Sequence, residues 1–391
     1  MTQYLLLNKV KVQNANAVSG FTWGFPAITH FLGFTHNLSL KLGRSTYQGF
    51  SLKGCTVVAH EHHVHTFGKY NDRFLQSKNP AYLSGDVNKV TQGGAPSIVE
   101  EGKMNMTVSL VMEFDGFVGR EVGDLLTWLK QQCLMQRLAG GSILSIEDVQ
   151  LFDSTSQQSF FKLKRLLMPG FILMDRSSHL AEYYQTCLDK NSEADQLEAW
   201  LDFIALRQQA RPISSLINKH LQEAGEQNLY SIWLEHLVKP YNIDIPQELI
   251  NYFSELEETK NTKTLLKQWN EYINPTNKTS AEWEYLSKPN PGYLIPIMTG
   301  YKAISPVYEN KEVANTRDSE TPVCFVESVH SVGEWLGVNR LKNHRDIASS
   351  LWNYQYDDGW YLCQQTKQLE NDESDLEQQV SVLFDPIDEL I

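Results

Sequence analysis

Hydrophobic and polar positions alternate most clearly over residues 104–114, where every second residue is apolar. These apolar positions are Met104, Met106, Val108, Leu110, Met112 and Phe114. Successive side chains of a strand point to opposite faces, so this pattern predicts a strand with one buried face. Similar but weaker patterns predict strands over residues 4–13, 50–66 and 143–152.

Two stretches between these strands follow the helical period instead. Apolar residues spaced three and four apart predict a helix from Pro26 to Leu42, with Gly43 as its C-terminal cap. A second helix is predicted over residues 120–138, before Gly140 and Gly141. The order β-α-β-β-α-β predicts an α+β, ferredoxin-like body, the pattern that RNA-recognition modules share. Both helices would cover one sheet face and leave the other free.

Changes in composition and hydrophobic periodicity divide the chain further. Residues 1–176 form the predicted body, and 67–102 is a long polar insertion within it. Several amphipathic helices separated by prolines predict a helical insertion over 177–288. Residues 289–356 return to the strand-and-helix pattern of the body. The stretch 357–391 is an acidic tail that we expect to be mobile.

The net charge of −13 is unevenly distributed. Residues 1–170 carry 16 Lys and Arg against 12 Asp and Glu, a net of +4. The nets of 171–290, 291–356 and 357–391 are −7, −1 and −9. Phosphate attraction depends on charges within a Debye length, about 8 Å in physiological salt. The acidic whole therefore does not exclude nucleic-acid binding by the first part of the chain.

Cysteine usage and hydropathy limit the class of protein. The five cysteines are scattered and form no CxxC pair, which argues against structural zinc and a disulfide framework. No apolar run is long enough to cross a membrane, and the first residues lack a secretory pattern. We therefore expect a cytoplasmic protein with no membrane partner, metal or cofactor.

The junction between the first strand and the first helix has an unusual composition. Gln13, Asn14, Asn16 and Trp23 place neutral amides and an indole in a stretch with almost no charge. Such groups suit the edges and faces of nucleobases. They would equally suit a protein groove, and loop amides often bond their own backbone instead.

Several segments resemble one protein family. The N-terminal segments are Val12–Ala17, Thr22–Pro26 and Phe31–Phe34. The later ones are Ile98–Lys103, Val313–Asp318 and Phe325–Leu336. In this order they are similar to the Cas-five-type (second Csy protein) subunit family of the type I-F CRISPR surveillance complex. The middle of the chain and its acidic tail carry no such likeness.

The resemblance implies a non-catalytic, RNA-binding subunit in antiviral defence. Such a subunit would bind the 5′ handle of crRNA together with the large Csy subunit. It would also contact the repeated backbone Csy subunit, and target DNA through the complex. The fold implied is the same ferredoxin-like one, of the RRM/RAMP type, and the insertion 67–102 would correspond to the family's thumb.

The residues expected to contact RNA fall into three groups. Bases would be held by Gln13, Asn14, Asn16 and Trp23. The residues that would contact phosphates are Lys9, Lys11, Arg44, Gly140 and Gly141. Lys69 and Arg73 of the insertion would press against the first guide segment. A basic cluster at Lys162, Lys164 and Arg165, beside Phe160 and Phe161, is either a solvated face or a further phosphate contact.

The run from His60 to His65 suggests an alternative. On a strand no face collects more than two of its four histidines, and the four-residue spacing of a helical HExxH site is absent. A guide-processing endoribonuclease using this strand remains one alternative function. A purely structural adaptor without RNA contacts is the other.

Overall fold

The computed structural model describes residues 2–69, 73–78, 98–116, 122–238, 245–274, 282–285, 288–316 and 318–365. The chain forms two compact units. Unit 1 comprises residues 1–192 and 292–391, and unit 2 comprises residues 193–291. Within the described residues, no helix combines the length and apolarity needed to cross a bilayer.

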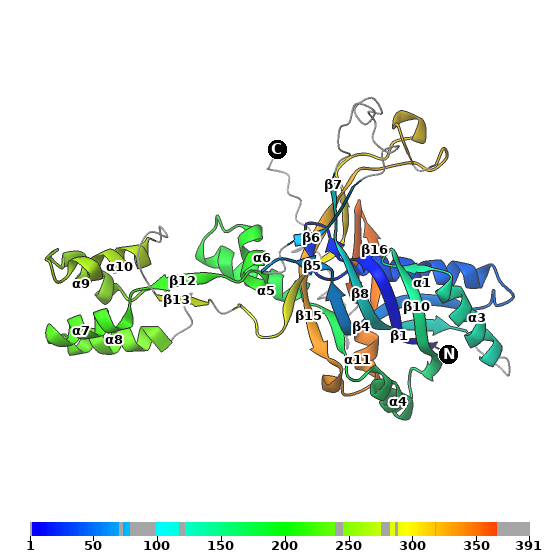
Figure 1. Cartoon of the computed structure of the whole chain (residues 1–391), viewed down its shortest axis with the longest axis horizontal. Helices are drawn as coiled ribbons and strands as arrows, with labels where there is room; N and C mark the ends of the chain where they lie inside the picture. The colour runs from blue at the N-terminus through cyan, green and yellow to red at the C-terminus, as the bar shows by residue number, and fades with distance from the viewer. Residues whose placement is uncertain are drawn as a thin grey trace. The chain divides into compact units, whose positions relative to one another are not determined.

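The predicted strands and helices of the body are present in unit 1 (Figure 1). The elements are β1 (Thr2–Asn16), α1 (Ile28–Gly43), β4 (Ser51–Val64), β8 (Lys103–Asp115), α3 (Val122–Leu134) and β10 (Gly141–Asp153). The four strands are antiparallel and lie in the order β4-β8-β1-β10. The α+β prediction is therefore confirmed.

The main core lies between this sheet and the two helices. The alternating apolar residues of β8 are all buried there, together with Phe31 and Leu38 of α1 and Leu125 and Leu129 of α3. Burying each such side chain contributes about 1.5–3 kcal/mol.

β1 keeps its apolar side chains on the core side through two irregularities. The pairing of β1 with β8 shifts between Leu7 and Val10 and again between Val12 and Ala15. Lys9 and Asn14 take positive φ values of 45° and 56° at these two places. Such bulges insert extra residues and re-aim the strand, so Val10, Val12 and Ala15 stay buried. The second bulge presents Gln13 and Asn14 to solvent.

The opposite sheet face is only partly free, contrary to the prediction. α4 (Gln157–Leu167) covers one end of it, with Phe160 and Leu163 packed in a second core that includes Tyr4 and Leu6. These two residues of β1 point away from the helices and require apolar cover of their own. The other end carries exposed polar residues, including Lys11 and Asn105.

Further strands extend the sheet beyond β4. They are β11 (Phe171–Asp175), β14 (Leu294–Ala303), β15 (Val326–Gly337), β16 (Trp352–Asp357) and β17 (Trp360–Gln365). Their order is β11-β15-β14-β17-β16-β4, and β11 also pairs with β4. These six strands therefore close into a ring. Between β15 and β16 lie η3 (Val338–Arg340) and α11 (His344–Ser349), and η2 (Asn310–Glu312) precedes β15.

β17 lies within the stretch expected to be an acidic tail. β17 itself contains no charged residue, since those of this stretch lie before and after it. Its Leu362 and Cys363 can therefore be buried against the neighbouring strands. The rest of the expected tail, residues 366–391, lies outside the described residues.

The insertion 67–102 contains regular structure where it is described. β5 (Thr66–Phe67), β6 (Arg73–Lys78) and β7 (Ile98–Glu101) form a three-stranded sheet, in place of an irregular loop. Residues 70–72 and 79–97 lie outside the described residues.

Unit 2 is mainly helical. Its elements are α6 (Gln196–Ile204), β12 (Gln208–Arg211), α7 (Ser214–Glu223), α8 (Gln227–Val238), α9 (Gln247–Glu255), α10 (Lys263–Ile273) and β13 (Glu282–Tyr285). Trp233, Phe253 and Trp269 fill its core. α5 (Ser177–Lys190), which lies in the predicted helical insertion, belongs to unit 1.

Gly140 and Gly141 do not cap a helix. α3 ends at Leu134, and the glycines follow the short strand β9 (Arg137–Leu138), which pairs back onto β10. Gly140 has a φ of 75°, which suits this tight hairpin turn. A Cβ on Gly141 would lie 2.7 Å from both Ala15 N and Gln13 O of β1. Gly141 thus lets the hairpin approach the second bulge of β1.

We predict that Gly141→Ala destabilises unit 1 by about 1–3 kcal/mol, because the new methyl group meets backbone atoms that cannot move aside. A lower melting temperature in thermal unfolding would measure this. The matched control is Gly123→Ala in α3, where a Cβ meets nothing within 4 Å and a helix gains stability from alanine. Equal melting temperatures for the two variants would contradict the proposed packing.

Candidate functional site

A small hairpin follows β1 directly. It consists of β2 (Val18–Ser19) and β3 (Thr22–Trp23). The Asn16 side chain donates from Nδ2 to the Val18 carbonyl oxygen at 2.8 Å and accepts from the Val18 amide at 3.1 Å. The Ala17 amide donates to the Gly102 carbonyl at 2.9 Å. The Asn16 amide group is therefore engaged by its own loop.

The hairpin packs against two segments that are distant in sequence. The Phe21 ring lies 4.0 Å from the His330 ring of β15, measured between centroids. Trp23 meets Phe74 of β6 edge-on at 5.1 Å. A Cβ on Gly20 would lie 2.2 Å from His330 Nε2, so this close approach requires glycine.

Three segments that carry the family resemblance thus meet in space. They are the N-terminal junction, the Gly102 region and β15. Phe25 of the junction also contacts Trp335 of β15, with ring centroids 4.9 Å apart and nearly perpendicular planes. Aromatic pairs of this geometry contribute about 0.5–1.5 kcal/mol beyond the area they bury.

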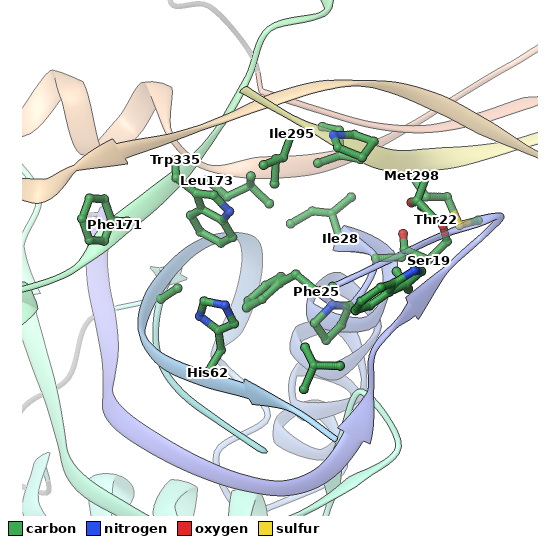
Figure 2. Close-up of a pocket in the computed structure, with 18 of the residues that line it drawn as sticks. Ser19, Thr22, Phe25, Ile28, His62, Phe171, Leu173, Ile295, Met298 and Trp335 are labelled. Atoms are coloured by element: carbon green, nitrogen blue, oxygen red, sulfur yellow. Dashed lines mark hydrogen bonds between the residues drawn. The ribbon is translucent and has the colours of Figure 1, made fainter. Parts of the chain in front are cut away.

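A cavity of about 580 Å³ lies beside the hairpin (Figure 2). Figure 2 shows Phe25 and His62 on one side of it and Leu173, Ile295 and Trp335 on another. Its lining comes from the junction, α1, β4, β11, the segment leading into β14, β14 itself and β15. The residues are Ser19, Thr22, Trp23, Gly24, Phe25, Pro26, Ala27, Ile28, Ala59, His60, His62, Val64, Phe171, Leu173, Tyr293, Ile295, Pro296, Ile297, Met298 and Trp335.

Among the described residues that line this cavity, none is a Lys, Arg, Asp or Glu. A phosphate group would find no countercharge in it and would lose its hydration on entry. An uncharged planar group or an apolar side chain fits the lining better, because several aromatic rings face the space. Trp23 is half exposed at the edge of this cavity, with 50% of its surface accessible.

His60 is held in one tautomer. Its Nδ1 lies 2.7 Å from the Pro169 carbonyl oxygen, which can only accept, so Nδ1 carries the proton. Its Nε2 lies 2.7 Å from Ser109 Oγ, a hydroxyl group that also lies 3.2 Å from Asn8 Oδ1. Burial lowers the pKa of His60 and favours the neutral ring. Both ring nitrogens are thus occupied, and the Ser109 hydroxyl is itself buried.

The other histidines of this strand separate as the pattern predicts. His62 lines the cavity with His60, whereas the rings of His63 and His65 lie 5.8 Å apart. Among the described residues, no three His, Cys, Asp or Glu side chains are placed to hold a metal ion. The arrangement of His60 is that of a wall residue rather than a general base.

The two exposed amides at the second bulge of β1 lie beside the glycine hairpin. Gln13 and Asn14 are exposed, and the Asn14 amide donates to Asn105 Oδ1 at 3.1 Å. Gly141 packs directly against the Gln13 carbonyl, and Gly140 is exposed. The structure therefore brings these four predicted residues together.

The predicted basic residues are more dispersed. Lys11 is exposed on the free part of the sheet, and Lys9 Nζ lies 3.4 Å from Glu147. Lys69 and Arg73 are exposed near the β5–β6 pair. Arg44 follows the C-terminal end of α1, a helix of 16 residues and so about 24 Å long. It lies far from the junction, which is at the other end of that helix.

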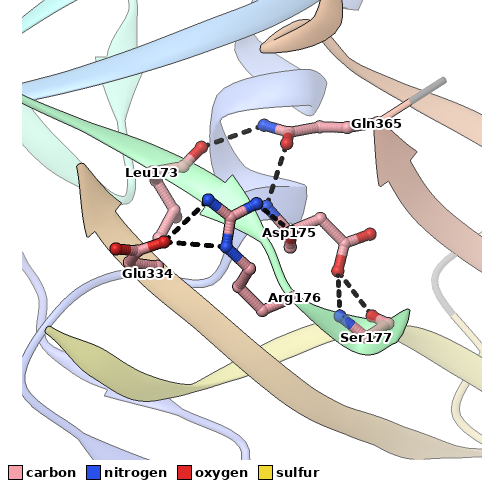
Figure 3. A network of polar contacts seen from close by, with 6 residues as sticks. All are labelled: Leu173, Asp175, Arg176, Ser177, Glu334 and Gln365. Carbon is pink, nitrogen blue, oxygen red and sulfur yellow. Dashed lines mark hydrogen bonds and ion pairs between the residues drawn. The ribbon is translucent and has the colours of Figure 1, made fainter. Parts of the chain in front are cut away.

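A partly buried polar network fixes one wall of the cavity (Figure 3). Arg176 Nε and Nη2 both lie 2.7 Å from Glu334 Oε2 and tie β11 to β15. The Gln365 side chain donates to the Leu173 carbonyl and accepts from the Asp175 amide. Glu334 is therefore a strand residue of β15 with an intramolecular partner.

The Asp175 carboxylate in the same network accepts from the amide and hydroxyl groups of Ser177. Burial raises the pKa of Asp175. These contacts hold the end of β11, and with it Leu173 of the cavity lining.

Sequence reasoning missed most of the cavity. Phe25 and Trp335 lie inside segments that resemble the family, and that likeness was the available signal. Phe171 and Tyr293 lie outside every such segment and carry no signal of their own.

Comparison with known proteins identifies the class and then the family. A family model described as CRISPR-associated protein (Cas_Csy2) matches residues 5–232 and 213–363. "CRISPR-associated protein Csy2" of Pseudomonas aeruginosa (strain UCBPP-PA14) is 30% identical over 366 residues, covering 89% of this chain and 90% of that protein. The chain is thus a CRISPR-associated protein. It belongs to the Csy2 family, and the matches include the middle region that lacked a recognisable likeness.

We predict that His60 makes stability depend on pH. Because its pKa is lowered in the folded state, the unfolded chain binds the proton first as the pH falls below 6.5. Stability is therefore fully present above 6.5 and falls as the pH falls towards the folded pKa. His60→Gln should flatten part of the fall in melting temperature between pH 7 and pH 5.

His62→Gln is the control on the same strand, because it makes the same substitution at an exposed histidine. Burial also lowers the pKa values of His30, His220 and His330, so part of the slope should remain. An unaltered slope in His60→Gln would contradict the assignment.

Proposed function

We propose that this chain is a non-catalytic subunit of the type I-F CRISPR surveillance complex that binds the 5′ handle of crRNA. Membership of the Csy2 family supports the complex and its other Csy subunits as partners. In this proposal the large subunit shares the handle and the repeated backbone subunit lies alongside. Guide–target pairing would read the DNA sequence, with protein contacts limited to backbone and shape.

The observation that carries the RNA assignment is the uncharged aromatic cavity, together with the exposed amides on the strand that leads into its junction wall. A nucleobase is planar and neutral, so it needs no countercharge when it enters a space lined by Phe25, Trp335 and His62. Gln13 and Asn14 offer donors and acceptors to base edges from the bulge of β1. Trp23, half exposed at the cavity edge, offers a stacking face.

Phosphates would lie outside the cavity. Lys11 is exposed on the same strand as the amides, and Lys9 forms an ion pair with Glu147. Gly140 is exposed and has no side chain, so an RNA backbone can approach it closely, whereas Gly141 is already packed against β1 and would act by holding this turn. Lys69 and Arg73 remain proposed contacts of the insertion, whereas the position of Arg44 leaves it out of this set.

The same proposal extends to the type of fold and to the division of the chain. The element order β1-α1-β4-β8-α3-β10 supports a ferredoxin-like, Cas-five-type body. The insertion 67–102 would be its thumb. The chain would divide into a body (1–176), a helical insertion (177–288), a returning segment (289–356) and an acidic tail (357–391).

The structural adaptor is the second candidate function, and the apolar cavity itself favours it. A large apolar side chain of a neighbouring subunit would fill the same space. The two candidates differ in what the exposed amides and Trp23 do, because an adaptor makes no use of base edges.

We predict that Trp23→Ala weakens binding of a 5′-handle RNA about 5- to 150-fold, the equivalent of one lost base stack of about 1–3 kcal/mol. The double variant Gln13→Ala with Asn14→Ala should weaken it as well. Gel shifts with this chain co-purified with its large subunit would measure both. Arg44→Ala is the control and should bind as the parent does.

Asn16→Ala serves a different purpose, since its amide group holds the loop. It should lower the melting temperature, whereas Gln13→Ala and Asn14→Ala should not. If RNA affinity survives in the Trp23 and amide variants while assembly with partner subunits is lost, the adaptor is correct and the RNA proposal is wrong.

We also predict that the pure protein leaves precursor crRNA intact over hours, because both nitrogens of His60 are occupied. Denaturing gels of a time course would detect cleavage. Cleavage that disappears in His60→Ala would overturn the non-catalytic proposal in favour of the endoribonuclease.

A further inference from the structure

A basic surface lies at the opposite end of the β1–β10 pair from the exposed amides. α4 follows β10 directly, and its buried residues pack against η3 and α11 in the second core of unit 1. Lys164 Nζ donates to the carbonyl oxygens of Asn339 and Leu341, at 2.9 and 2.6 Å. These two residues flank Arg340. α4 and α11 therefore lie side by side (Figure 1).

Cations from two distant parts of the chain converge there. The exposed ones are Lys162, Arg165, Arg340, Lys342 and Arg345, which we call the α4 surface. Residues 153–170 and 338–349 together carry six Lys and Arg against two Asp, a net of +4 in a chain of net charge −13.

The two acidic residues of these segments are engaged locally. The Asp153 carboxylate accepts from the amide and hydroxyl groups of Thr155, and these hydrogen bonds lower its pKa. The Asp346 carboxylate accepts from the Asn343 amide and caps α11. They stabilise helix and turn ends, and the net charge of +4 already includes both carboxylates.

An aromatic ring accompanies these charges. Phe161 is 55% exposed and stands one helical turn from Arg165, at spacing i, i+4. Its ring lies 5.4 Å from the buried Phe160 ring, which fixes its position. An exposed ring among cations suits single-stranded nucleic acid, whose bases can leave their stack, better than a duplex, whose bases are enclosed.

We infer that the α4 surface binds a single-stranded segment of RNA, through its phosphates and one base stacked on Phe161. This inference rests on the proposed function, because that function supplies the RNA. The site is separate from the junction. β10 has 13 residues between Gly141 and Asp153, and at about 3.3 Å per residue the two sites lie about 40 Å apart.

The test uses the full chain and a fluorescent 20-nucleotide oligouridine, which carries no handle sequence. The triple variant Lys162→Ala, Arg165→Ala, Arg340→Ala should bind it about tenfold more weakly. The slope of log affinity against log salt should fall by about 2, since each lost phosphate contact contributes about 0.7 on single strands. Phe161→Ala should weaken binding about fivefold or more with the salt slope unchanged.

A charge-matched control replaces three exposed lysines of unit 2, Lys260, Lys263 and Lys267, by alanine. It removes the same charge and should leave both affinity and slope as in the parent. Equal losses in the control and the α4 triple variant would show a general charge effect and overturn the inference. Tighter binding of oligothymidine DNA than of oligouridine would overturn RNA as the occupant.

The two proposals fail separately. If Trp23→Ala abolishes handle binding while the α4 triple variant binds oligouridine normally, the α4 inference is wrong and the proposed function stands. If the α4 triple variant loses oligouridine while the junction variants bind handle RNA normally, the junction assignment fails and the α4 surface stands.

Discussion

The packing of the β2–β3 hairpin onto β15 is the contact on which the candidate site depends. Gly20 lets the hairpin reach His330, and Phe25 meets Trp335 a few residues further along both segments. Without this contact the N-terminal junction would be an ordinary loop, and the cavity would lose the wall that the junction supplies. The site is therefore a product of chain closure between segments about 300 residues apart in sequence.

Electrostatics act locally in this protein. The chain is acidic as a whole, yet the cavity is uncharged and the α4 surface is positive. A neutral cavity and a basic surface suit different parts of one ligand, since bases enter apolar spaces and phosphates seek cations. Charge repulsion from the rest of the chain is screened beyond about 8 Å, so these surfaces can act independently.

The βαββαβ part of the fold was predictable because its signals are local. The two-residue period of residues 104–114 and the helical spacing of Phe31 and Leu38 each fix an element within a few turns of chain. The bulges at Lys9 and Asn14 were not predictable, since positive φ at these residues depends on pairing with β8. The same holds for α4, whose cover of Tyr4 and Leu6 depends on three-dimensional proximity.

By itself the sequence determined the α+β class, the central strands and helices, the Csy2-type family and the amide-rich composition of the junction. Only the tertiary structure decided that Asn16 bonds its own loop, that Arg44 lies apart, and that a cavity exists. The physical reason is the distance along the chain over which each interaction acts. Periodicity and turn chemistry act between near neighbours, whereas a cavity and a charged surface arise where distant segments such as β3, β15 and α4 come to rest.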